Sequence, residues 1–127
     1  MAVGVRERIK EDGSGKKPTR YYSKKQETAI AEATQGSRTP NSGATAWSKG
    51  DVLTEKFLLE AKTKTKSSDT ITIRKDWFVK NTEEAVFMGK PYSALVFSFG
   101  PGEENHYIID ESLFQELLEY LNDKDER

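Results

Sequence analysis

The stretch 48-SKGDVLTEKFLLEAKTK-64 sets a short apolar run, FLL, directly before Glu60, Ala61 and Lys62. Asp51 lies nine positions before Glu60 in the same stretch. A buried strand has no ordinary reason to end on a carboxylate and a lysine, so the pattern indicates a functional site. The alternative is a surface strand end that carries a Glu–Lys pair.

Two neighbouring strands are predicted from this stretch. Residues 57–63 form the longer strand, and residues 52–53 pair with it through a tight turn. Side chains alternate along a strand, so Glu60 and Lys62 share one face, and a hairpin register could bring the Asp51 carboxylate beside that of Glu60. Two converging carboxylates form a hard oxygen site that suits Mg2+ or Mn2+. A nearby lysine can orient a water or neutralise charge that develops on a phosphate.

The composition is that of a polar chain with one domain. The sequence has 127 residues, 32% of them charged, and no run is apolar enough to span a membrane. Cysteine is absent, which excludes disulfides and thiolate metal sites and fits a cytoplasmic protein. Residues 1–20 are predicted to be a flexible basic arm without the apolar segment of a signal peptide, and residues 21–127 a single folded domain.

Charge is unevenly distributed along the chain. Residues 1–80 carry 17 Lys and Arg against 10 Asp and Glu, whereas residues 81–127 carry 3 against 11. This asymmetry favours a polyanion contact on one side and a solvated acidic face on the other. Charges that merely gather on helices are the alternative.

The rest of the pattern predicts an α/β (α+β) domain, with a mixed central sheet flanked by helices. Helices are predicted over residues 23–34, 74–89 and 111–123, and further strands over residues 71–73, 92–100 and 106–110. Ser23 and Gln26 would form a capping box, and Gly89 would end the second helix. The last helix carries an apolar stripe of Leu113, Phe114, Leu117, Leu118 and Leu121.

Aromatic residues outside the motif are interpreted as core: Trp47, Trp77, Phe97 and Phe99. His106, the single histidine, is expected to lie on a strand far from the motif and is given no catalytic role.

The motif resembles the PD-(D/E)XK nuclease superfamily, in particular its small Holliday junction resolvases of archaeal and phage type. The resemblance covers about residues 22–120 and departs from the family pattern at Gly50, where a proline often precedes the motif aspartate. It depends on a first helix with a glutamate, a Gly/Ser-rich loop, and the acidic motif with its lysine: Glu27, 36-GSRTPNSG-43, Asp51, Glu60, Lys62 and Thr63.

The resemblance implies a restriction-endonuclease-like nuclease domain with one acidic metal site. Asp51, Glu60 and the backbone carbonyl of Ala61 would hold Mg2+, with Mn2+ as a substitute. Lys62 would position the attacking water, and Glu27 would complete the acidic cluster from the first helix.

Five residues are candidates for DNA contact. Arg38 and Ser42 resemble family positions that meet the DNA backbone near the scissile phosphate. Lys49, Lys64 and Lys66 flank the motif and suit phosphate contacts. Each of them can equally be an ordinary surface residue.

The implied activity is that of a structure-selective DNA endonuclease, a Holliday junction resolvase that makes paired symmetric incisions in four-way junctions during recombination and repair. Paired incisions imply a two-fold homodimer, with an interface on the sheet or the second predicted helix. No membrane partner and no small-molecule cofactor are expected, and the location would be the host cytoplasm if the protein is phage-encoded. The alternatives are a nuclease of the same fold that acts on flaps, ends or nicks, and a non-catalytic DNA-binding module.

Overall fold

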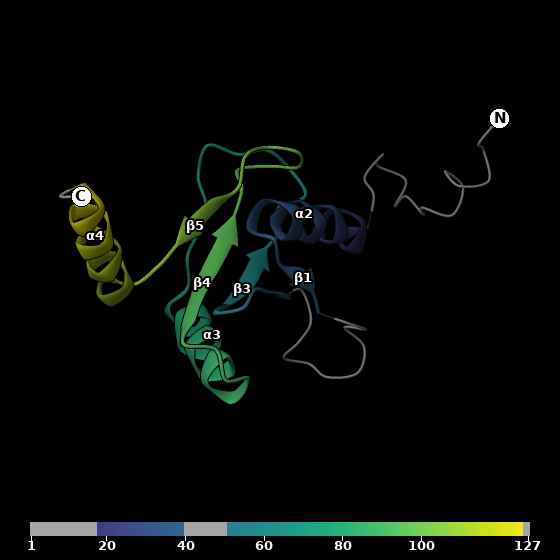
Figure 1. Ribbon diagram of the computed structural model, residues 1–127. Helices are drawn as coiled ribbons and strands as arrows, with labels where there is room; N and C mark the ends of the chain where they lie inside the picture. Colours follow the sequence, from purple (N-terminus) through teal and green to yellow (C-terminus); the bar gives the residue numbers. More distant parts are fainter. Residues whose placement is uncertain (1–17, 40–50, 126–127) are drawn as a thin grey trace.

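The computed structural model describes residues 18–39 and 51–125, which form one mixed five-stranded sheet with helices packed on it (Figure 1). The α+β architecture expected from the sequence is therefore confirmed. Within these residues, no helix is long and apolar enough to cross a membrane. The elements in chain order are α2 (Thr19–Thr34), β1 (Ser37–Arg38), β2 (Asp51–Leu53), β3 (Phe57–Lys62), α3 (Lys75–Phe87), β4 (Tyr92–Phe97), β5 (His106–Ile108) and α4 (Glu111–Asp125).

The strands lie in the order β1-β2-β3-β4-β5, so the motif strand β3 is at the centre. β3 runs antiparallel to β2 and parallel to β4, while the outer pairs are antiparallel. A parallel pair needs a crossover, and α3 supplies it between β3 and β4. The turn before β3 is tight: the backbone N–H of Phe57 donates a hydrogen bond to the side-chain hydroxyl of Thr54 at 2.9 Å.

Two helices cover the two faces of the sheet. α2 packs on one face through Ile30, which joins a buried cluster with Val52, Leu59, Ala94 and Val96. α3 covers the other face, where Leu58 and Leu95 are buried and where Glu60 and Lys62 also point because side chains alternate along β3. The acidic motif therefore lies between the central strand and α3.

The first helix begins earlier than the sequence predicts. α2 starts at Thr19 after Pro18, whose fixed φ suits the start of a helix. Ser23 lies inside this helix and donates a hydrogen bond to the Arg20 carbonyl at 3.1 Å, so the predicted capping box with Gln26 is wrong. The last two residues of the predicted arm belong to α2, and residues 1–17 lie outside the described residues.

Two further boundary predictions have opposite outcomes. Residues 71–73 do not form a strand, since they lie in the crossover between β3 and α3, where no strand pairs with them. Gly89 does follow the end of α3, and its φ of +73° is a backbone conformation that glycine adopts without strain.

Candidate active site

Asp51 and Glu60 are direct cross-strand partners in the β2–β3 pair, as the hairpin register predicted. Paired residues on neighbouring strands have Cβ atoms about 5 Å apart on the same face. Lys62 lies on that face two residues further on, and its Nζ is 2.6 Å from Glu60 Oε2. The structure thus brings all three motif side chains together at one end of the hairpin.

Asp51 is only 1% exposed, and its Oδ2 atom has no hydrogen-bond partner. Burial raises the pKa of this carboxyl to about 8, with further contributions from the charges of Glu84, Glu60 and Glu27, and Lys62 opposes the shift. A buried carboxyl oxygen without a partner is unfavourable unless something else binds it. A cation beside Asp51 and Glu60 would supply that partner.

Lys62 is positioned from several directions. Its ammonium group lies 4.2 Å from the centre of the Trp77 ring on α3, in a cation–π contact. Trp77 is half-buried beneath the motif lysine. It therefore contacts the site in addition to the core role predicted from the sequence.

Gln26 ties the end of β3 to α2. Its Nε2 donates to the Lys62 carbonyl at 3.2 Å and to Asn105 Oδ1 at 3.1 Å, and its Oε1 accepts a hydrogen bond from the Thr63 hydroxyl at 2.8 Å. These bonds fix the backbone on which Lys62 stands. The sequence predicts Gln26 in a helix cap, and nothing in the residues around Gln26 indicates a contact with the end of β3.

α3 contributes two polar residues to the motif face that the sequence analysis missed, Asn81 and Glu84. Together with Trp77 they are spaced four and three residues apart, which places them on one side of the helix. Asn81 is 2% exposed, and its Nδ2 has no partner. Burial, and next the charge of Glu60, raise the pKa of Glu84. The helical spacing from Trp77 is the signal that could have identified them.

Glu27 and Arg38 form a pair of their own. Arg38 Nε donates to Glu27 Oε1 at 3.2 Å, and Glu27 is 7% exposed on α2. Arg38 pairs with Val52 in the sheet and so lies on the α2 face, opposite to the motif face. The charge of Glu27 still contributes to the raised pKa of Asp51.

A hollow of about 480 Å3 lies beside the end of β3, between α2 and the β4–β5 turn. Tyr21, Tyr22, Lys25 and Lys64 are among the side chains that line it. Lys64 also donates a hydrogen bond to the Thr70 carbonyl at 3.3 Å. Of the other predicted DNA contacts, Lys66 is exposed, and Ser42 and Lys49 lie outside the described residues, as does Trp47.

His106 is closer to the motif than the sequence analysis expected. In the sheet register Lys62 pairs with Phe97, and Phe97 pairs with His106. His106 is therefore level with Lys62, two strands away, or about 10 Å. Its ring stacks on that of Phe97, with 5.4 Å between ring centres. Phe97 and the neighbouring Phe99 are only half-buried, so the prediction that they are core is wrong.

Within the described part of the chain, no three His, Cys, Asp or Glu side chains form a ready-made metal-binding group. Asp51 and Glu60 are two such side chains, and the expected third ligand is a backbone carbonyl. The chain matches no protein-family model, no curated protein and no solved structure in the comparisons made. The resemblance to a nuclease family therefore depends on the motif residues and their geometry.

Proposed function

We propose that this protein is a metal-dependent, structure-selective DNA endonuclease that resolves four-way junctions by paired incisions. One observation carries the proposal: Asp51, buried and with an unpartnered oxygen, lies directly across from Glu60 and next to the Glu60–Lys62 ion pair. A purely structural Glu–Lys pair has no need of a second, buried carboxylate beside it.

The residues fit a divalent cation. Asp51, Glu60 and the Ala61 carbonyl would hold Mg2+ or Mn2+, since all three offer oxygen ligands. Such an ion, when bound, polarises a phosphate and acidifies a water. The unpartnered Oδ2 atom of Asp51 is the specific feature of this chain that a cation would satisfy.

Lys62 supplies the positive charge for a phosphate or a positioned water. Its ammonium group is paired with Glu60 and lies over the Trp77 ring. On this face Lys62 would meet a phosphate oxygen or hold a water beside the carboxylates. Gln26 holds the Lys62 backbone, so a change of partner would need a movement of the lysine side chain alone.

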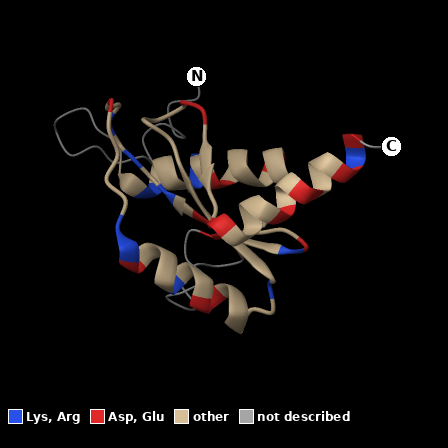
Figure 2. Ribbon diagram, turned by 90° about the vertical axis from the view of Figure 1, so that its left-hand side faces the viewer, with Lys and Arg blue, Asp and Glu red and all other residues tan. Residues whose placement is uncertain are grey.

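The hollow next to β3 suits the DNA strand that leaves the site. Lys64 and Lys25, whose ammonium group lies 5.4 Å from the centre of the Tyr21 ring, offer charge to phosphates. Figure 2 shows several Lys and Arg residues (blue) near the start of α3 and several Asp and Glu residues (red) along α4. The start of α3 is therefore a more favourable side of approach for DNA than α4.

Cleavage of defined DNA substrates tests the proposal. A four-way junction, a flap and a linear duplex are incubated with Mg2+ or with chelator, using wild type, Glu60→Gln and Glu55→Gln. Glu55 is an exposed residue of the β2–β3 turn, so its variant removes the same charge outside the site.

We expect paired cuts in the junction that require metal, that persist in Glu55→Gln and that fall at least ~100-fold in Glu60→Gln. Metal-dependent cutting of flaps or duplex at equal rates would move the assignment to a repair or replication nuclease of the same type. Binding without cutting in any metal would leave a non-catalytic DNA-binding module.

A further inference from the structure

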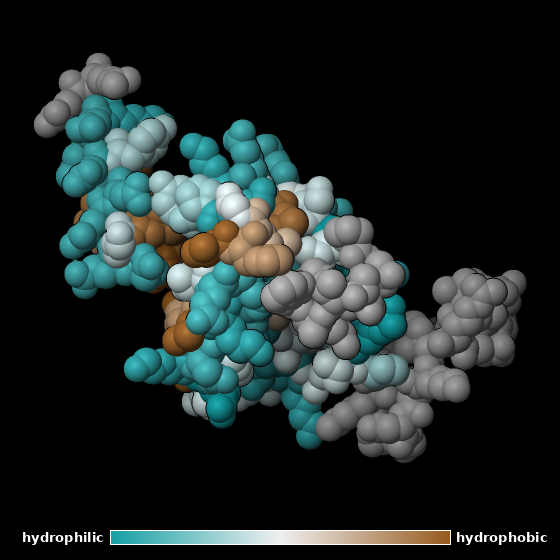
Figure 3. Space-filling view, turned by 90° about the horizontal axis from the view of Figure 1, so that it is seen from below, coloured by the Kyte–Doolittle hydropathy of each residue, from teal (hydrophilic) through white to brown (hydrophobic). Residues whose placement is uncertain are grey.

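The last helix exposes a continuous apolar stripe. Five large side chains of α4 are roughly half exposed, at fractions between 43% and 62%: Phe114, Leu117, Leu118, Tyr120 and Leu121. In Figure 3, hydrophobic side chains (brown) reach the surface at the left, where α4 lies. A stripe of this kind on a solvent-facing helix marks an interaction site.

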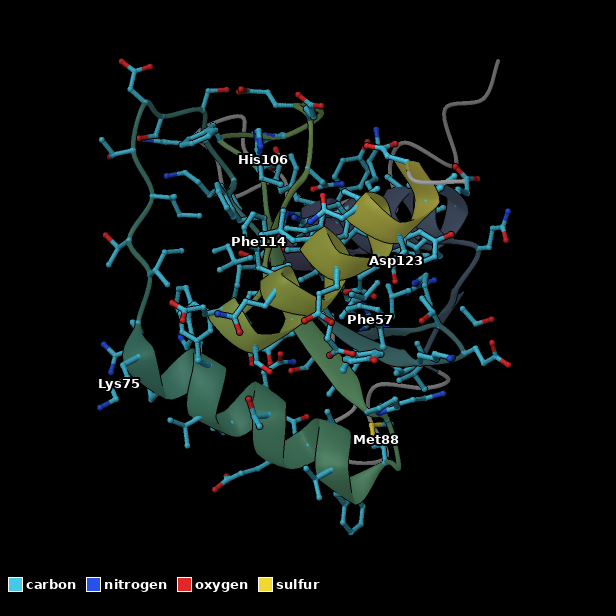
Figure 4. The ribbon with its side chains drawn as sticks, turned by 60° about the vertical axis from the view of Figure 1, so that its left-hand side comes forward. Phe57, Lys75, Met88, His106, Phe114 and Asp123 are labelled. Carbon is cyan, nitrogen blue, oxygen red and sulfur yellow. The ribbon has the colours of Figure 1, made fainter. Side chains whose placement is uncertain are left out.

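α4 is attached to the rest of the molecule mainly by its first turns. Leu113 is the buried residue of the helix, and its N–H is capped by Asp110 Oδ1 at 2.9 Å. Glu116 accepts a hydrogen bond from the Tyr92 hydroxyl at 3.0 Å. Otherwise α4 makes few contacts with the sheet or with the other helices, and Figure 4 shows it running from Phe114 to Asp123 away from α3. The body of the described protein therefore leaves the stripe uncovered.

The acidic residues Asp123 and Glu116 of α4 lie away from its apolar stripe. Asp123 and Glu116 lie on the opposite side of the helix from Leu121 and Leu118, as the 100° advance per residue requires. The net negative charge of α4 disfavours DNA and anionic membranes as ligands. The positions of Asp123 and Glu116 leave the centre of the stripe free of like-charge repulsion against another apolar helix.

The stripe is complementary to itself. Four of its five side chains are symmetric in spacing about the midpoint between Leu117 and Leu118, so an antiparallel second copy sets Phe114 level with Leu121 and Leu117 level with Leu118. With about 200 Å2 for each fully exposed large side chain, the stripe presents roughly 500 Å2, and two copies bury ~1,000 Å2. That area reaches the lower bound for a specific interface.

We infer that the α4 stripe is the surface through which two copies of this chain associate about a two-fold axis. This surface differs from the interface predicted from the sequence, which lies on the sheet or on the helix α3. The functional purpose of this dimer rests on the proposed function, because two active sites related by a two-fold axis suit two symmetric incisions. The association itself does not depend on catalysis.

The test measures the mass of the full chain in solution and uses Leu118→Glu with Val79→Glu as its matched control. Val79 lies on α3 and is 48% exposed, against 44% for Leu118, so both changes place a carboxylate on an exposed apolar position. We expect a wild-type dimer and a Val79→Glu dimer. Leu118→Glu should raise the dissociation constant at least ~100-fold, because the two-fold axis buries two unpaired charges. Circular dichroism should be unchanged in both variants.

Cross-linking distinguishes self-association from other occupants. The chain contains no cysteine, so Leu118→Cys introduces a single thiol. Under mild oxidation it should form a covalent dimer, whereas Val79→Cys should not. A monomeric wild type, or a Leu118→Glu variant that stays dimeric, would overturn the inference. A dimer without metal-dependent cleavage would refute the proposed nuclease function but support the interface. A monomer that still cuts DNA would support the nuclease function but refute the interface.

Discussion

Asp51→Asn should stabilise the metal-free protein at alkaline pH. The wild-type carboxyl is 1% exposed, and burial with neighbouring acidic charges raises its pKa from 3.8 to about 8. A difference of about four pH units corresponds to roughly 5–6 kcal/mol of unfavourable interaction with the charged form. Water entry and side-chain relaxation reduce this figure, so we expect a gain of about 2–3 kcal/mol in the free energy of unfolding.

The direction of the pH dependence follows from the raised pKa. Between about pH 4 and pH 8 the unfolded chain has lost the Asp51 proton while the folded chain retains it. The unfolded state therefore binds fewer protons, and the contribution of Asp51 to stability falls as the pH rises through this window. The advantage of Asp51→Asn should be absent at the acidic end and complete above about pH 8.

Metal should reverse the order of the two proteins. A cation that binds the folded state stabilises the wild type by an amount that grows with its concentration, and Asp51→Asn loses a ligand for it. The assay is urea unfolding at about pH 5 and about pH 9, with chelator and then with Mg2+ or Mn2+. Asp69→Asn, which neutralises an exposed carboxylate, is the control. If Asp51→Asn is less stable than the wild type at high pH in chelator, or if metal stabilises both equally, the metal site is refuted.

Three further substitutions probe the surroundings of the motif. Glu84→Gln should lower the pKa of Asp51, because the Glu84 charge is the largest electrostatic contribution to its rise, and a carboxyl titration by NMR measures the shift. Gln26→Leu removes the bonds to Lys62, Thr63 and Asn105 and should reduce stability by about 2–3 kcal/mol and slow cleavage, as urea unfolding and rate measurements would show. Asn81→Leu removes an unpartnered buried donor, so the variant should be at least as stable as the wild type in chelator, while its cleavage rate should fall. A loss of stability with unchanged cleavage would assign Asn81 to packing alone.

The local part of the site could be predicted from the sequence because it is a hairpin. A tight turn and an apolar strand fix which residues face each other, and the Asp51–Glu60 pair follows from that register. The alternation along β3 likewise placed Lys62 on the same face. These relations involve neighbours in the chain, for which turn chemistry and strand period are sufficient.

The long-range part could not be predicted in the same way. Gln26 reaches the end of β3 across 36 residues of sequence, and no pattern within α2 indicates such a partner. Asn81 and Glu84 lie on a helix whose placement depends on the handedness of the β3–β4 crossover. The short apolar run at residues 71–73 was misinterpreted for a related reason: β-branched composition predicts a strand only where a neighbouring strand is present to pair with it.

Sequence periodicity predicts that α4 has an apolar face, but it does not predict what covers that face. The spacing of Phe114, Leu117, Leu118 and Leu121 correctly indicates a helix with one face to be kept from water. It does not indicate whether that face is covered by the same chain. In the described protein α2 packs on β1, β2 and β3, α3 packs on β3 and β4, and α4 has few contacts with any strand. If two copies associate through this stripe as inferred, its hydrophobic energy is gained on association, and the stability of this helix then depends on protein concentration. The stripe should therefore become exposed to solvent on dilution. At protein concentrations below the dissociation constant, hydrogen exchange of the α4 amides should become faster, while that of the β3 and β4 amides stays unchanged.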